Sequence, residues 1–185
     1  QPHMTVISPC DSEEARKATT AAAQLAGPVY LRFGREKTPV MTTGESPFVI
    51  GKANTIWKHD APAVAIFATG PLLHNALLAA KHLEGDGAAV TVTNIHTIKP
   101  LDSESVVALA RASGAVVTVE EHQVHGGLGS AIAECLAANF PVPIEFIGVQ
   151  DIFGQSGEPK ELIEHYQMGV SHIADAVKKV ISRKK

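Results

Sequence analysis

Acidic and imidazole side chains gather with glycines in one stretch of the sequence, residues 117–130, which reads VTVEEHQVHGGLGS. The titratable residues in it are Glu120, Glu121, His122 and His125. They follow an apolar β-branched segment, and the carboxyl end of a parallel strand is where such side chains can face a ligand. They could transfer protons or hydrogen-bond a substrate near neutral pH. They could equally cap the next helix or hold a neighbouring loop or subunit, so both uses stay open.

Three glycines, Gly126, Gly127 and Gly129, come directly after these side chains. Their spacing lacks the third glycine and the acidic partner of a dinucleotide-binding fingerprint. Glycines here could expose helix amides to a phosphate, but close packing between elements or subunits is favoured. A zinc site would need a third nearby ligand, so we predict no metal site. Our candidates for a subunit-interface or site-adjacent role are Glu121, His122, His125 and Gly127.

Two arginines, Arg32 and Arg35, flank the end of a predicted strand, with Gly34 between them. If the strand continues, its alternation places the two side chains on opposite sides, so that one of them reaches a given cleft. A planar guanidinium suits a phosphate or carboxylate ligand. A surface ion pair with Glu36 is the competing interpretation, and residue chemistry alone does not decide between them.

A third dense stretch, DIFGQSGEP at residues 151–159, combines an aromatic residue with two glycines before a helix start. Ser156 has no neighbouring histidine and acid in a nucleophile-elbow pattern, so the stretch does not predict a hydrolase. It indicates a shaped loop.

Composition limits the class of protein. The 185 residues are 45% hydrophobic with a net charge of −3, which favours a globular protein and not a nucleic-acid-binding one. The two cysteines lie far apart, so neither a disulfide framework nor a structural zinc site is expected. No apolar run approaches the roughly 20 residues that span a bilayer. We therefore expect a cytoplasmic protein.

Strands alternate with helices along the chain, which predicts an α/β fold. A first strand, helix and strand occupy residues 4–33 and form a partial β-α-β unit, too small to bury both faces of its sheet. The later strands are expected near residues 63–68, 89–95, 115–119 and 144–149. With helices between them, they predict a three-layer α/β/α domain with a mainly parallel sheet. Residues 48–57 are expected to form a hairpin.

The polar, turn-rich segment at residues 41–47 indicates a linker. We therefore divide the chain into residues 1–40, the linker 41–47 and the domain 48–185.

Several ordered motifs together resemble the carboxyl-terminal part of the transketolase family of thiamine diphosphate enzymes. Residues 2–11 (PHMTVISPCD) and 27–35 (GPVYLRFGR) resemble the end of the family's pyrimidine-binding domain. The motifs ATG, IKPLD, EEH with GGLG, and FGQSG, within residues 68–157, resemble its C-terminal domain. The resemblance covers essentially the whole chain.

The resemblance implies an enzyme that transfers a two-carbon ketol unit between sugar phosphates, with thiamine diphosphate and Mg²⁺ in the complete protein. It places the thiamine chemistry upstream of Gln1, so we expect neither a catalytic residue nor cofactor binding in this chain alone. It assigns binding of the substrate's phosphate group to Arg35. The implied partners are the upstream domains or a separate N-terminal subunit, in a homodimer or heterotetramer.

Other members of the family remain alternatives, namely deoxyxylulose-phosphate synthase and the β subunit of a 2-oxoacid dehydrogenase. A chain that serves only as a dimerisation or regulatory module is a further alternative. The sequence leaves open whether these residues are a natural subunit, a designed piece or a proteolytic fragment. It also leaves open the donor and acceptor sugars, the oligomeric state and the role of residues 120–125.

Overall fold

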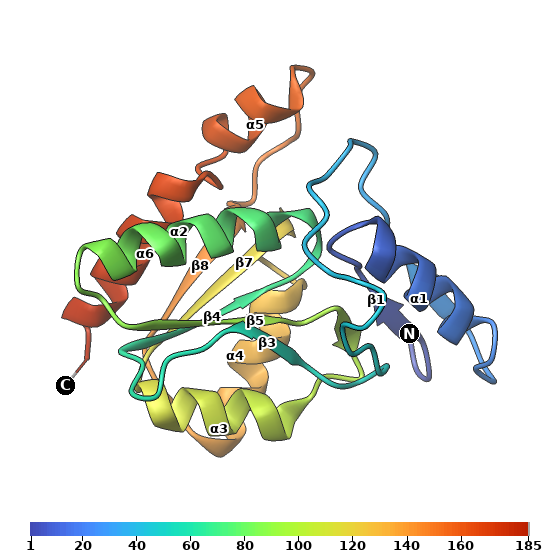
Figure 1. Cartoon of the computed structure of the whole chain (residues 1–185), viewed down its shortest axis with the longest axis horizontal. Helices are drawn as coiled ribbons and strands as arrows, with labels where there is room; N and C mark the ends of the chain where they lie inside the picture. The colour runs from blue at the N-terminus through green and yellow to red at the C-terminus, as the bar shows by residue number, and fades with distance from the viewer. Residues whose placement is uncertain (185) are drawn as a thin grey trace.

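The computed structural model describes residues 1–184, which form a five-stranded sheet between helices with a smaller three-stranded sheet beside it (Figure 1). The large sheet has the order β3 (Asn54–Trp57), β5 (Val90–Asn94), β4 (Val64–Ala68), β7 (Val116–Gln123) and β8 (Ile144–Val149). β4 pairs in parallel with β5 and β7, and β7 pairs in parallel with β8. Among the described strands of this large sheet, only the edge strand β3 is antiparallel to its neighbour. The prediction of a mainly parallel sheet is confirmed.

Helices cover both faces of this sheet. They are α2 (Leu73–Gly85), α3 (Ser103–Ser113), α4 (Leu128–Asn139) and α6 (Val170–Ser182). The side chains of β4 alternate between two cores: Val64, Ile66 and Ala68 pack with α2 and α6, whereas Ala65 and Phe67 pack with α3 and α4. In Figure 1, α2 and α6 lie above the sheet and α3 and α4 lie below it. Burial on both faces explains why this strand is wholly apolar, and the predicted three-layer fold is confirmed.

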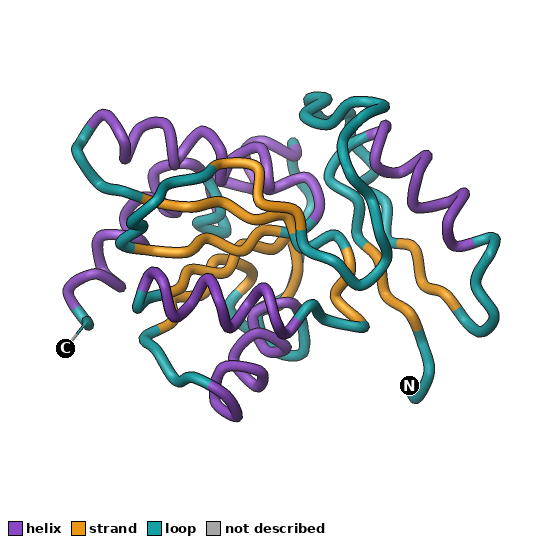
Figure 2. Tube along the Cα trace, turned by 60° about the horizontal axis from the view of Figure 1, so that its bottom comes forward, coloured by secondary structure: helices purple, strands orange, loops and turns teal. Residues whose placement is uncertain are grey.

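The small sheet contains the predicted partial β-α-β unit. Its elements are β1 (Thr5–Ile7), α1 (Ser12–Ala22), β2 (Val29–Leu31) and β6 (Thr97–Lys99). β1 pairs in parallel with β2 and antiparallel with β6, which follows β5 in the chain. The backbone of Ser8 links the two sheets, since its N–H donates to His96 O at 2.8 Å and its carbonyl accepts from Gly70 N at 3.2 Å. Figure 2 shows the small sheet beside the layered body.

The segment between β2 and β3 contains no helix or strand. Its middle, at Met41 and Thr42, is hydrogen-bonded to the side chain of Asp11. The Asp11 carboxylate caps α1 by accepting from Glu14 N at 2.9 Å. It also accepts from Met41 N at 2.7 Å, Thr42 N at 2.6 Å and Thr42 Oγ1 at 2.8 Å. Burial alone would raise the pKa of Asp11, but these hydrogen bonds outweigh it and lower the pKa. The predicted linker is therefore held against α1, and the domain division there stays a prediction.

The structure differs from the predicted elements in two places. The hairpin within residues 48–57 is wrong: only Asn54–Trp57 is a strand, and it pairs with β5. Phe48 instead stacks on the buried ring of His96, with ring centroids 4.3 Å apart. Second, β7 extends to Gln123, so that Glu120, Glu121 and His122 lie on the strand itself and not in a turn after it.

A 3-10 helix, Gly70–Leu72 (η1), leads into α2, and a short helix, Pro159–His165 (α5), precedes α6. α5 and the loop before it project from the body in Figure 1. The loop side chain of Phe153 is 98% exposed. The backbone of the loop is held by the Gln123 amide, which donates to Ile152 O and accepts from Asp151 N. The stretch 151–159 is thus a shaped loop, as predicted.

Candidate functional site

A cavity of about 530 Å³ lies between the small sheet and the carboxyl end of β7. Its lining includes Ser8, Arg32, Lys99, Glu120, His122 and Ser130. These residues come from the end of β1, the end of β2, β6, the end of β7 and the start of α4. The two sheets meet here because β6 continues from β5 into the small sheet. The end of β7 therefore does face a cleft.

Glu120 is 1% exposed and binds the start of α4 through both carboxylate oxygens. Oε2 accepts from Leu128 N and Oε1 accepts from Gly129 N, each at 2.8 Å. These amides are among those that a helix leaves without intrahelical partners, and the helix dipole favours a negative charge beside them. Burial raises the pKa of Glu120, opposed by the two amides, His122 and Arg32. Both oxygens are occupied, so the arrangement suits a structural role and not proton transfer.

The glycines of the motif make room for this carboxylate. A Cβ atom on Gly127 would overlap Glu120 Oε2 and would lie 2.9 Å from the carbonyl oxygen of Gln123. A Cβ atom on Gly129 would lie 2.6 Å from the ring of Phe146. Neither glycine has a positive φ, so close approach and not backbone strain requires them. The close packing predicted for this motif therefore occurs between elements of one chain.

The remaining candidate residues of the motif differ in their surroundings. Glu121 is half-buried and lines the cavity, as does Gly127. His122 Nδ1 lies 2.8 Å from Gln123 O and 3.9 Å from Glu120 Oε2. Because a carbonyl only accepts, Nδ1 carries the proton in this contact, and Nε2 is left as an acceptor in the neutral ring. His125 is exposed on the turn between β7 and α4.

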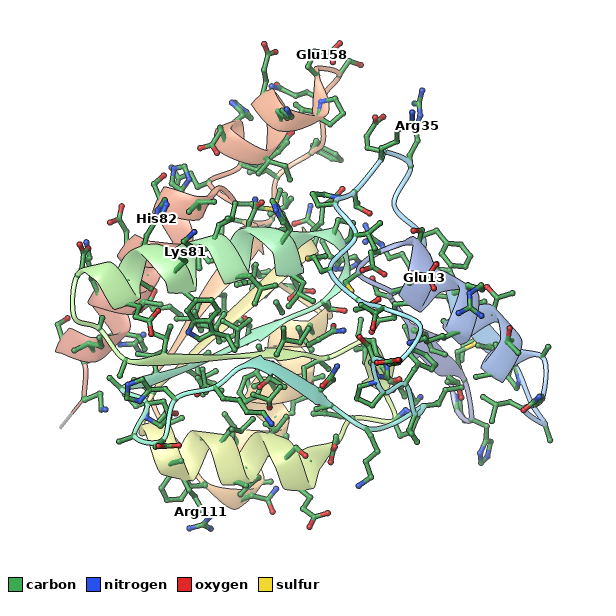
Figure 3. The ribbon with its side chains drawn as sticks, in the orientation of Figure 1. Glu13, Arg35, Lys81, His82, Arg111 and Glu158 are labelled. Atoms are coloured by element: carbon green, nitrogen blue, oxygen red, sulfur yellow. The ribbon has the colours of Figure 1, made fainter. Side chains whose placement is uncertain are left out.

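The two arginines lie in different surroundings, but β2 ends at Leu31, so the strand alternation considered for them does not reach either residue. Arg32 is half-buried, lines the cavity and donates from Nη2 to Glu121 O at 2.7 Å. Arg35 is exposed, and Figure 3 shows it at the tip of a loop, pointing away from the body. Within residues 1–184 it forms no ion pair with Glu36. The assignment of substrate phosphate to Arg35 stays a prediction.

A second buried polar cluster, missed from the sequence, joins α1 to β5. Glu14 is 2% exposed; its carboxylate accepts from Cys10 N at 2.8 Å and from Asn94 Nδ2 at 2.7 Å. Burial raises the pKa of Glu14, and burial next to the carboxylates of Glu14 and Asp11 raises that of Cys10. The acidic first turn of α1 signalled a helix start, but nothing local marked Glu14 as buried. The cluster therefore has a structural role, because it connects α1 to β5. Cys10 is not a reactive thiol, since a thiol held neutral is a poor nucleophile.

Metal and membrane features add two findings. Among residues 1–184, no group of three or more His, Cys, Asp or Glu side chains is arranged to hold a metal ion. No helix in this part of the chain has the length and apolar character to cross a membrane.

The structure is that of an α/β protein: a three-layer domain with a partial β-α-β unit packed beside its sheet. Comparisons with known proteins identify the family. Residues 51–173 match the family described as "Transketolase, C-terminal domain". The chain belongs to this family.

Individual relatives cover the whole chain. The chain is 42% identical over 183 residues to the 6-deoxy-6-sulfo-D-fructose transketolase subunit SqwH of Clostridium sp. (strain MSTE9). This alignment covers 99% of this chain and 56% of that protein. The chain is 37% identical to the 1-deoxy-D-xylulose-5-phosphate synthase of Methylibium petroleiphilum, covering 96% of this chain and 28% of that protein. A solved structure of a split gene transketolase, described as an inactive beta4 tetramer, superposes with a TM-score of 0.95 at 40% identity. That match covers 100% of this chain and 60% of the other. The chain thus spans 56% of the SqwH subunit, 60% of the split gene transketolase chain and 28% of the synthase.

Proposed function

We propose that the chain is the C-terminal part of a transketolase-type enzyme that transfers a two-carbon ketol unit between sugar phosphates. The observation that carries this proposal is the match of the whole of this chain to 60% of the split gene transketolase, at 40% identity and a TM-score of 0.95. A chain with such similarity over both the small sheet and the three-layer domain fits a split-gene subunit better than a general α/β domain.

The role proposed for Arg35 is to bind the anionic group of the substrate. Its guanidinium is exposed at a loop tip and is free of an ion pair with Glu36, so its charge is available to a ligand. A phosphate or a sulfonate offers oxygens that a planar guanidinium can bind in pairs. This chain would then contribute substrate positioning rather than bond cleavage.

Thiamine diphosphate and Mg²⁺ belong to the proposed complete enzyme, where the cofactor would carry out the cleavage of the ketol unit. The family resemblance places the residues that hold this group in the upstream domains and not in this chain. We therefore expect this chain alone to bind no cofactor and to be inactive. Calorimetric detection of tight thiamine diphosphate binding by these residues would contradict this.

The proposed partner is the remainder of the enzyme, as upstream domains or a separate N-terminal subunit, in a homodimer or heterotetramer in the cytoplasm. β2 pairs on one side with β1 and leaves its other edge open among the described strands. Tyr30 on β2 and Phe33 just after it are each 53% exposed. Natural proteins usually cover an open strand edge flanked by aromatic side chains, so this edge is where we expect further strands to pair.

The test is an assay of the complete protein with three substrate pairs. Xylulose 5-phosphate with ribose 5-phosphate tests the proposed reaction, and pyruvate with glyceraldehyde 3-phosphate tests a deoxyxylulose-phosphate synthase. The third pair replaces the donor by 6-deoxy-6-sulfo-D-fructose, a second candidate favoured by the 42% identity to SqwH. Ketol transfer in the first or third pair supports the proposal. Turnover of pyruvate alone among the donors would refute it, and activity with no pair would favour a non-catalytic module.

A further inference from the structure

The residues just before Arg35 are attached to the three-layer domain at two places. Arg32 continues the small sheet through its backbone, since its N–H donates to Ile7 O at 2.9 Å. Its side chain reaches away from that sheet, and Nη2 donates to Glu121 O at 2.7 Å, across 89 positions of sequence. A hydrogen bond from a charged guanidinium to a carbonyl is stronger than a neutral one. Arg32 therefore ties the end of β2 to the end of β7.

The second attachment lies at Gly34. A Cβ atom there would approach Pro71 Cγ to 3.0 Å, so the backbone at Gly34 packs directly against the start of η1. Arg35 is the first residue beyond this contact, and its side chain points outward (Figure 3). The segment that leads into the Arg35 loop is thus held at two positions, Arg32 and Gly34.

The carbonyl that receives Arg32 is itself held in place. Glu120, the preceding residue, binds the first amides of α4 through its carboxylate. Beyond it, Gln123 pairs with Val149 of β8, and Val124 N donates to Val149 O at 3.0 Å. The acceptor of Arg32 therefore lies near the end of β7, between two residues that are fixed to α4 and β8, where the pairing of β7 with β8 is irregular.

The two arginines also differ in the charges that surround them. The guanidinium of Arg32 lies close enough to the buried carboxylate of Glu120 to help lower its pKa against the effect of burial. The guanidinium of Arg32 thus has a buried carboxylate of the protein nearby, whereas Arg35 is exposed. Arg32 suits an anchoring role, and Arg35 suits a ligand.

We propose that Arg32 is a positioning residue through which the three-layer domain fixes the loop bearing Arg35, and so sets the affinity for the anionic end of the substrate. This rests on the role proposed for Arg35 above. A guanidinium held by an ordered loop loses less conformational freedom on binding than one on a mobile loop. Loss of the anchor should therefore weaken substrate binding without altering the chemical step.

The experiment measures kinetics of the complete enzyme with Arg32→Met, which keeps an unbranched side chain and removes the hydrogen-bond donor. Xylulose 5-phosphate is the donor, and the acceptor is ribose 5-phosphate or unphosphorylated ribose. We expect the KM for ribose 5-phosphate to rise about five- to tenfold, which is less than the full effect of one charged hydrogen bond because Arg32 acts through the loop, with kcat within about twofold. The KM for ribose should not change. Arg32→Lys, which keeps a donor, should recover part of the loss.

Matched variants separate the possible failures. Arg16→Met removes an exposed arginine of α1 that pairs with Glu13, and should change neither KM. If Arg35→Gln raises the KM for ribose 5-phosphate but Arg32→Met does not, the positioning role is refuted and the proposed function stands. If Arg35→Gln has no effect, the role proposed for Arg35 fails and the positioning role fails with it. An equal rise for both acceptors in Arg32→Met would show general damage and would also refute positioning.

Hydrogen exchange supplies a readout independent of activity. Amides 33–37 should exchange faster in Arg32→Met than in the unmodified protein, with the strands of the large sheet unchanged. Should Arg32→Met fail to fold, Gly34→Ala perturbs the same loop at its other attachment, where the new Cβ meets Pro71. It should give the same selective rise in KM, and an unchanged KM would refute the proposal.

Discussion

Substitution of Gly127 by alanine should destabilise the protein through the carboxylate of Glu120. The new Cβ would overlap Oε2 and lie 2.7 Å from Cδ of Glu120, so the carboxylate must leave its position. It would then lose the amides of Leu128 and Gly129, both bonded at 2.8 Å. A buried donor left without a partner costs about 1–3 kcal/mol, so two such amides predict a loss of about 3–5 kcal/mol. This is a large part of the roughly 5–15 kcal/mol that stabilises a typical domain.

A double-mutant cycle measures whether the carboxylate is the cause. Glu120→Ala leaves the same two amides unpaired and should cost a similar about 3–5 kcal/mol. In that background, Gly127→Ala no longer meets a carboxylate, and only the carbonyl oxygen of Gln123, at 2.9 Å, resists the new Cβ. The double variant should therefore be about as stable as Glu120→Ala alone, which means a coupling as large as the cost of Gly127→Ala itself, about 3–5 kcal/mol, at or above the upper end for residues in contact.

Urea unfolding followed by circular dichroism gives these free energies, provided the dependence on denaturant is the same in all four proteins. Gly44→Ala is the matched control, because a Cβ there meets nothing within 4 Å. It should leave stability within about 0.5 kcal/mol, as expected for a surface substitution. Additive costs of Gly127→Ala and Glu120→Ala would refute the reasoning, because they would mean that the glycine serves something other than the carboxylate.

Two further variants test other buried polar groups. Asp11→Ala removes the acceptor of Met41 N and Thr42 N and should make residues 38–47 a preferred site of limited proteolysis; unchanged cleavage would mean that the segment is held elsewhere. His96 is 1% exposed, and burial lowers its pKa to about 4. Because the unfolded chain binds the proton near pH 6.5, folding stability should be full above that pH and fall by up to about 3 kcal/mol as the pH drops to 4, and His96→Gln should flatten this decline in a pH series of unfolding curves.

The layered part of the fold could be predicted because its signals are local. The apolar run at 64–68 and the capping Asp102 before α3, whose carboxylate accepts from Ser105 N, are legible from neighbouring residues. The hairpin at 48–57 failed because its apolar residues have distant partners. Phe48 stacks on His96, and no neighbour of Phe48 reveals that contact.

The candidate site could be located from the sequence but not interpreted. Histidines and carboxylates after an apolar strand correctly pointed to a cleft at the end of β7. The strand was expected near residues 115–119, whereas the structure continues it to Gln123 and buries Glu120 against the amides of α4. The anchoring contact of Arg32 could not be predicted from the sequence either, because its acceptor is a backbone carbonyl 89 positions away. Backbone acceptors have no signature in the residue pattern.

The pairing of β6 with β1 bears on how this polypeptide acquires its structure during synthesis. Val6 pairs with Lys99, and Ile7 with Thr97, so the small sheet needs residues that leave the ribosome long after β1 and β2. Contacts of such long sequence separation form late and slowly. Until β6 has been synthesised, the edge of β1 that will pair with it stays unpaired. An unpaired strand edge in a partly folded chain is prone to wrong pairings. Nascent chains halted before residue 97 should therefore depend on chaperones, and those released after α3 should depend on them less.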